Sequence, residues 1–279
     1  MRSRIILTLL LVVALTGCGG SSGAGGKTRV VAAFYPIAYA AARLGGPGVS
    51  VQNLTPPGVE PHDLEATPSA VRAVKEADHV LLLGHGFQPQ LEAAAGNGPN
   101  VVHLLDTPGL RLHGADPHVW LDPLRYSLIV KRIAVALGRP RAAAPLVTQL
   151  HALDREYRAA LTHCARREIV TSHEAFGYLA ERYGLSQIAI TGITPEAEPR
   201  PQELRHVIDV VRRTHATTVF FETLVSPRLA DTVAREAGAK TAVLNPIEGL
   251  TKEQAKQGDD YFTLMRQNLS ELRKALACR

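Results

Sequence analysis

The sequence predicts an α/β protein of two similar βα lobes, each built on a mainly parallel four-stranded sheet, joined by a long rigid linking helix. Short apolar runs rich in β-branched residues recur along the chain, with turn residues and helical patterns between them. This rhythm is typical of βα units around parallel sheets. Four runs fall in each half of the chain, and a long helical pattern separates the two sets.

The expected strands are short and evenly distributed. In the first half they are Thr28 to Phe34, Val49 to Asn53, His79 to Leu83 and Asn100 to Leu104. In the second half they are Glu168 to Thr171, Ser186 to Ile190, Thr218 to Phe221 and Thr241 to Leu244.

The helical connection extends over Pro123 to Leu137 and Arg141 to His163. Its second part has apolar residues at spacings of three and four, the period of an amphipathic helix; they are Leu146, Leu150, Leu153, Tyr157 and Leu161. A helix is also expected from Asp259 to Leu276. A connection of this length cannot flex like a pair of loop hinges.

The first residues predict export. Arg2 and Arg4 precede an apolar run from Ile5 to Leu15, which is shorter than the roughly 20 residues that a membrane-spanning helix needs. We therefore expect a signal peptide at 1–17. The following LTGC resembles a lipobox, so Cys18 would carry the lipid that anchors the chain to the cell membrane; an ordinary signal peptide with a chance cysteine is the alternative. Residues 18–27 form a Gly/Ser-rich tether.

Beyond the tether, the expected parts are an N-terminal lobe at 28–122, linking helices at 123–163 and a C-terminal lobe at 164–279. Loss of Arg2 and Arg4 lowers the net charge from +5 to +3, a balance that argues against nucleic acid as a partner. Two cysteines remain, Cys164 and Cys278. In an oxidising compartment this pair suggests a disulfide, with two buried free thiols as the alternative.

The chain has 11 histidines, and their positions separate candidates for ligand binding from the rest. Ligands of open α/β folds gather beyond the carboxyl ends of strands. Six histidines fall within expected strands or in or beside helices, which makes them poor candidates: His79, His103, His151, His163, His206 and His215.

Three histidines are better placed. His62 lies in a proline-rich loop after the second strand, where prolines reduce the entropy lost on fixing a ligand. His118 lies between Pro117 and Pro123, where the lobes join, and His173 comes two residues after a strand of the second lobe. Converging imidazoles suit zinc better than calcium or magnesium, although spacing alone supports such a site only weakly.

A catalytic zinc is the alternative interpretation of three histidines, since it would keep an open position for water. The sequence carries no His-x-x-x-His pair on one helix of the zincin type. It also lacks a Ser-His-Asp or Cys-His signature. A binding protein is therefore favoured over a zinc metalloenzyme.

Several long motifs, in order along nearly the whole mature chain, resemble the metal-binding receptors of ABC importers. They are PPGVEPHDLEATPS at 56–69, DPHVWLDP at 116–123, IVTSHEAFGYLAERYGL at 169–185, PEAEPRPQEL at 195–204, FFETLVSPRLA at 220–230 and DYFTLMRQNL at 260–269. The chain is most similar to the zinc branch of the group that also contains manganese receptors.

This resemblance implies that His62, His118 and His173 bind a metal between the lobes. Manganese members typically have glutamate where this chain has His173, and a nitrogen ligand there favours zinc. Zinc members often carry a histidine-rich insertion before the DPHVW motif, which here is reduced to His113, Gly114 and Ala115. Asn245 falls where relatives usually place an aspartate ligand.

The sequence does not identify the fourth ligand of the metal. We expect Glu60 or a bound water to complete the tetrahedron, with Asn245 near the metal but at best a weak oxygen ligand. Glu222 is expected to orient a ligand, because outer carboxylates commonly accept the second imidazole proton.

The resemblance implies an extracytoplasmic, lipid-anchored monomer without enzymatic activity, which captures one zinc ion and delivers it to an ABC permease. A manganese or iron receptor of the same family is the nearest alternative. A surface adhesin is a further one, since some relatives have been so described.

Overall fold

The computed structural model describes residues 26–279. The expected signal peptide, the lipidation site Cys18 and most of the tether lie outside the described residues. Within residues 26–279, no helix combines the length and the apolar character that crossing a membrane requires.

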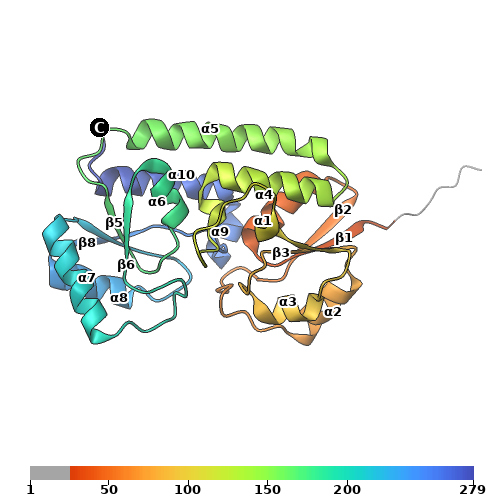
Figure 1. Ribbon diagram of the computed structural model, residues 1–279, viewed down its shortest axis with the longest axis horizontal. Helices are drawn as coiled ribbons and strands as arrows, with labels where there is room; N and C mark the ends of the chain where they lie inside the picture. Colours follow the sequence, from red (N-terminus) through yellow and green to blue (C-terminus); the bar gives the residue numbers. More distant parts are fainter. Residues whose placement is uncertain (1–25) are drawn as a thin grey trace, which may run out of the picture.

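The first lobe contains a parallel sheet with the strand order β2-β1-β3-β4 (Figure 1). Its strands and helices alternate along the chain: β1 (Thr28–Ala32), α1 (Tyr35–Gly45), β2 (Val49–Asn53), α2 (Pro68–Glu76), β3 (His79–Leu82), α3 (Pro89–Ala95) and β4 (Val101–His103), followed by the short helix η1 (Leu104–Asp106).

The second lobe repeats this topology in the order β6-β5-β7-β8, again with all strands parallel. Its elements are β5 (Glu168–Thr171), α6 (Gly177–Tyr183), β6 (Ser186–Ala189), α7 (Pro201–Thr214), β7 (Thr218–Phe221), α8 (Arg228–Ala237) and β8 (Lys240–Val243). In each lobe the strand that comes first in sequence, β1 or β5, lies inside the sheet, next to the strand that comes third. The fold class predicted from the sequence is confirmed.

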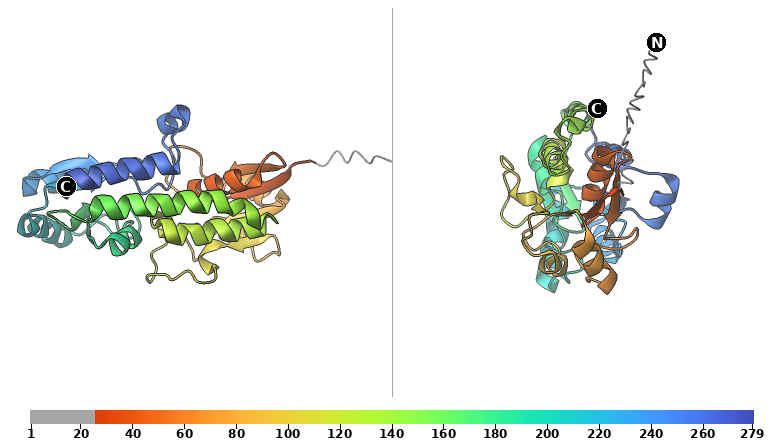
Figure 2. Two further views of the ribbon diagram at one scale, coloured as in Figure 1. Left: turned by 90° about the horizontal axis from the view of Figure 1, so that it is seen from above. Right: turned by 90° about the vertical axis from the view of Figure 1, so that its right-hand side faces the viewer.

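The remaining helices lie between the two lobes along the chain or follow the last strand, β8. They are η2 (Val119–Leu121), α4 (Pro123–Ala136), η3 (Pro140–Ala142), α5 (Ala143–Leu161), α9 (Lys252–Gln257) and α10 (Tyr261–Ala275). Helix α5 extends from the first lobe to the second, and α10 runs beside it (Figures 1 and 2).

Local sequence explains where the connecting helices begin. Asp122 caps α4, because its Oδ1 accepts a hydrogen bond from the N–H of Leu124 at 2.8 Å, and Pro123 occupies the first helical position. Asp260 caps α10 in the same way through the N–H of Thr263.

One hydrophobic core runs through both lobes. It joins buried side chains of β1 and β3 to those of α4, α5, α6 and α10, while a smaller cluster lies between the second sheet and helices α7 and α8. The buried Tyr157 hydroxyl on α5 donates to the Met265 carbonyl on α10 at 2.5 Å. The predicted pairing of Cys164 with Cys278 is also present, and it ties the ends of these two helices together.

The structure shifts some predicted boundaries. Three strands match residue for residue, and the others are one or two residues shorter or displaced by one. Helix α6 begins only at Gly177, because the chain after His173 first forms an irregular loop. That loop turns His173 towards the space between the lobes.

Candidate metal centre

His62 lies in the loop between β2 and α2. Its backbone N–H donates to Oε1 of Glu60 at 3.1 Å, and its ring packs edge-on against Phe87 with the centroids 4.6 Å apart. Its side chain is 8% exposed. The proline-rich loop therefore presents this imidazole at the inner edge of the first lobe with little exposure to water.

His118 is fully buried just before η2. Oδ1 of Asp116 lies 2.9 Å from its backbone nitrogen and 2.7 Å from its Nδ1. A carboxylate in this place accepts the Nδ1 proton, which leaves the lone pair on Nε2. Asp116 thus fixes both the tautomer and the direction of the ring.

His173 follows β5 and is also buried. Its Nδ1 lies 2.7 Å from Oε1 of Glu222, which follows β7 and accepts a second hydrogen bond from the Ser172 hydroxyl at 2.5 Å. The Thr171 hydroxyl donates to the His173 carbonyl at 2.8 Å. Through this contact Glu222 can accept the Nδ1 proton and so orient the imidazole of His173.

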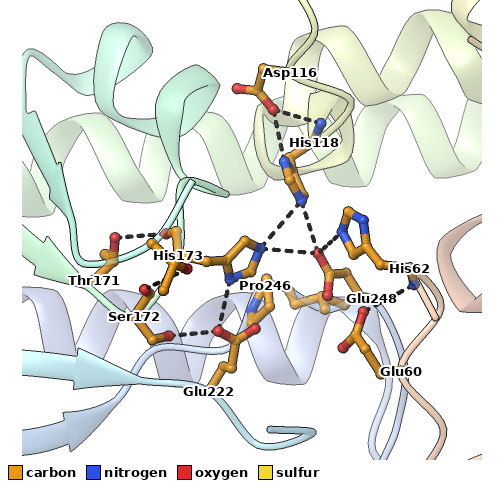
Figure 3. Close-up of polar contacts among 12 residues, drawn as sticks. Glu60, His62, Asp116, His118, Thr171, Ser172, His173, Glu222, Pro246 and Glu248 are labelled. Carbon is orange, nitrogen blue, oxygen red and sulfur yellow. Dashed lines mark hydrogen bonds and ion pairs between the residues drawn. The ribbon is translucent and has the colours of Figure 1, made fainter. Parts of the chain in front are cut away.

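Glu248 completes the cluster. Its Oε1 lies 3.3, 2.9 and 3.5 Å from the Nε2 atoms of His62, His118 and His173, respectively (Figure 3). One ligand atom from each of the four side chains lies within 4.8 Å of the others. Three imidazole nitrogens and one carboxylate oxygen therefore converge on one buried point between the lobes.

The loop after β8 is shaped to deliver Glu248. Oδ1 of Asn245 accepts from the Ile247 N–H at 2.7 Å, and Ile247 has a left-handed backbone with a φ of 59°. Asn268 on α10 holds Asn245 with two hydrogen bonds, to its N–H and its carbonyl. The Trp120 indole donates to the Pro246 carbonyl at 2.7 Å.

The cluster strongly perturbs the titration of its members. Burial lowers the pKa of His173, but hydrogen bonds to Glu222 and Glu248 outweigh burial and raise that pKa to about 10. The pKa of His118 is raised in the same way by Asp116 and Glu248. Burial raises the pKa of Glu248, yet the three histidines hold it well below its usual range. Burial and the nearby Glu248 raise the pKa of Glu60 to about 9.

The donor set fits zinc. Zinc takes four ligands in tetrahedral sites and accepts histidine nitrogen together with carboxylate oxygen. Calcium takes six to eight oxygens, and magnesium demands octahedral oxygen coordination. A neutral imidazole lone pair at each Nε2 is what such a site requires.

The structure corrects the sequence prediction for the fourth position. Glu248, rather than Glu60 or Asn245, lies among the three imidazoles. Glu60 lies further out, with one carboxylate oxygen within 4.8 Å of oxygens from Glu222 and Glu248. The side-chain oxygen of Asn245 accepts a hydrogen bond from the Ile247 N–H and is not one of the four ligand atoms of the cluster.

Sequence reasoning missed two residues of this site. Glu248 lies three residues after Asn245 in the same LNPIEGL segment, and only the turn at Ile247 directs it inward. Asp116 could have been found, because it lies two residues before His118 in the DPHVWLDP motif, at the spacing of a local turn contact.

Solved structures resemble this one in fold and sequence. The Zn(II)-bound ZnuA-like domain of Streptococcus pneumoniae AdcA is 32% identical, with a TM-score of 0.76 over 90% of this chain and 99% of that domain. The laminin-binding protein Lmb of Streptococcus agalactiae, described as bifunctional with adhesin and metal-transporting activity, is 28% identical. Its TM-score is 0.81, over 89% of this chain and 99% of Lmb.

Curated relatives agree with this likeness. The zinc-binding lipoprotein AdcA of Streptococcus pneumoniae serotype 4 is 30% identical over 97% of this chain, which spans only 60% of that relative. The high-affinity zinc uptake system protein ZnuA of Bacillus subtilis is 31% identical over 98% of this chain and 96% of its own length. The family described as ZnuA, zinc-uptake complex component A periplasmic, matches residues 30–275. The chain belongs to the ZnuA family.

Proposed function

We propose that this protein captures one zinc ion outside the cytoplasm and delivers it to the permease of an ABC importer. The observation that carries this proposal is the convergence of three histidine Nε2 atoms and one glutamate oxygen on a buried point between two lobes. Family membership and the zinc-uptake names of the relatives support it. We further propose that lipid on Cys18 anchors the chain to the membrane, as the word lipoprotein in a relative's name suggests.

A receptor accounts for the site better than an enzyme does. Catalytic zinc keeps a position open for water or substrate, whereas structural and transport sites can fill all four. With Glu248 as fourth ligand, beside His62, His118 and His173, no position is left for a reacting water. The same ligand supplies a negative charge that three neutral imidazoles lack.

Zinc is proposed over manganese because of the nitrogen donors. His173 presents an imidazole whose Nδ1 is fixed by Glu222, and imidazole suits zinc while carboxylate and water suit manganese. The runner-up, a manganese or iron receptor, would have to bind its metal through the same three nitrogens.

The test is a metal titration of the purified protein. We expect one tightly bound zinc per chain, with zinc displacing manganese in competition. Replacing Glu248 by Gln should weaken zinc binding by about 10- to 100-fold or more, because a charged ligand is lost from a buried site. Glu253→Gln, on the exposed face of α9, is the matched control and should bind as the wild type does.

Two outcomes would contradict the proposal. If Glu248→Gln binds zinc as tightly as Glu253→Gln, Glu248 is not a ligand. If manganese displaces zinc at equal concentration, the protein is a manganese receptor of the same fold.

A further inference from the structure

A cavity of about 290 Å³ opens beside His62. It is lined by loops of the first lobe, including Gly84 to Phe87 and Gly114 to Pro117, and by Ile193 and Thr194 of the second lobe. His62 is the most accessible member of the metal centre, with 8% of its side chain exposed against 0 to 1% for the others. The cavity is therefore the side from which an ion can reach His62.

His85 lies on the wall of the same cavity in an unusual backbone conformation. It has a φ of 59° and stands between Gly84 and Gly86, whose φ values are 92° and 80°. A side chain rarely adopts this left-handed region, and glycine or asparagine would adopt it at lower cost. Backbone strain of this kind clusters at ligand sites.

A carboxylate orients the His85 ring. Its Nε2 lies 2.8 Å from Oδ1 of Asp106, with the two side chains 48% and 64% exposed. When Nε2–H donates to this carboxylate, the lone pair lies on Nδ1. In the metal centre, Asp116 and Glu222 likewise hold one ring nitrogen of His118 and His173 and leave the other free, although there the held nitrogen is Nδ1.

The charge along the cavity favours a cation. Asp106 contacts His85 near the surface, and Asp116 lines the cavity next to the metal centre. Among the described residues that line this cavity, none is lysine or arginine. Clefts lined by one sign of charge concentrate counter-ions and raise association rates.

We propose that His85, oriented by Asp106, is a transient capture site that binds zinc at the wall of this cavity and passes it to His62. The proposal rests on the proposed zinc-binding function. A single exposed histidine–carboxylate pair holds the ion too weakly to retain it. His85 would therefore speed the binding and release of zinc at the main site without adding to its affinity.

The test measures zinc binding rates by stopped-flow fluorescence. Trp120 is the only tryptophan of the chain, and its ring centroid lies 5.2 Å from that of His118, so its emission reports occupation of the main site. The variant is His85→Asn, because asparagine tolerates the left-handed backbone while lacking the imidazole. His215→Asn is the matched control, since His215 has a φ of 52° at the end of α7 in the second lobe.

We expect His85→Asn to lower the association rate of zinc by about tenfold and the dissociation rate by the same factor, leaving the equilibrium Kd unchanged. His215→Asn should change neither rate. An unchanged association rate in His85→Asn would overturn the capture site. So would a weaker Kd caused by faster dissociation, since that outcome makes His85 a support of the main site. A wild-type protein that binds no zinc would instead overturn the proposed function itself.

Discussion

At the scale of single residues, the site depends on carboxylates that hold imidazoles. Asp116 and Glu222 each contact an Nδ1 atom at 2.7 Å, so His118 and His173 turn their Nε2 atoms inward. These Nε2 atoms face Oε1 of Glu248, which raises the pKa of both imidazoles and so favours their protonated forms. If the proposed function holds, zinc displaces such protons, because a ligating imidazole uses its lone pair.

The pKa of His173 sets the direction of the pH dependence. Its value of about 10 in the folded protein lies above its ordinary value of 6.5. Its proton therefore stabilises the metal-free protein fully below pH 6.5, and this contribution is lost as the pH rises through about 10. Zinc competes with that proton, so the apparent zinc affinity should rise with pH across this range.

We predict that zinc binding at pH 7 releases roughly two protons, from His118 and His173, whose pKa values are both raised. Calorimetric titration in buffers of different ionisation enthalpy measures this number directly. Zinc binding without proton release, and with an affinity that does not change between pH 6 and 9, would mean that both imidazoles are already neutral.

At the scale of elements, the sequence predicts regular structure better than it predicts loops. The β-branched runs and the three-and-four spacing of α5 predict eight strands and the main helices, since these patterns follow from one-sided burial. His62 and His173 could be selected because they follow strands, and ligands of open α/β folds gather beyond strand ends. His118 follows no strand directly, and it could be selected by its place where the lobes join and by the resemblance of the DPHVWLDP motif. Glu248 could not, since its direction depends on the left-handed turn at Ile247 and on two hydrogen bonds between Asn245 and Asn268 on α10, which is distant in sequence.

Helix α6 fastens the loop that carries Asp116. The buried Tyr178 hydroxyl donates to the Asp116 carbonyl at 2.9 Å and accepts from the His113 N–H at 2.9 Å. Its ring stacks on that of His113, with the centroids 4.4 Å apart, and the Arg125 guanidinium lies 4.8 Å from the ring centroid. An element of the second lobe thus positions the first-lobe residue that orients His118.

We predict that Tyr178→Phe keeps the fold but weakens zinc binding by about tenfold, because the hydroxyl no longer fixes the loop behind Asp116. The free energy of unfolding should fall by about 1–3 kcal/mol, since two backbone groups lose a buried partner. Zinc titration and thermal unfolding measure the two effects.

Tyr183→Phe is the matched control on the same helix. The Tyr183 hydroxyl donates to Oδ1 of Asp154 on α5 at 3.3 Å, so its loss should lower stability without changing zinc affinity. Equal zinc affinities of the two variants would show that Tyr178 does not act on the metal centre.

At the scale of the whole molecule, two βα lobes meet along a shared helical core. Helix α5 spans both lobes, and α10 packs beside it, so one continuous set of buried side chains joins the two sheets. The metal centre lies where loops from both sheets meet (Figure 3). We therefore expect zinc binding to reorder loops around His62, His118 and Glu248 more than it rotates the lobes.

The disulfide between Cys164 and Cys278 closes this architecture, because it joins the chain after α5 to the chain after α10 across a sequence separation of 114 residues. In the chain-entropy model a loop of this length gives a stabilisation of about 4–5 kcal/mol, and measured values are often smaller.

We predict that the Cys164→Ser/Cys278→Ser double variant unfolds at a lower temperature than the wild type, by a margin that vanishes when the wild type is reduced. Zinc affinity should be unchanged, because the bridge ties helix ends rather than the loops of the metal centre. Peptide mapping of the oxidised protein should find the two cysteines linked. Free thiols at both positions, or a double variant as stable as the oxidised wild type, would show that no disulfide stabilises the second lobe.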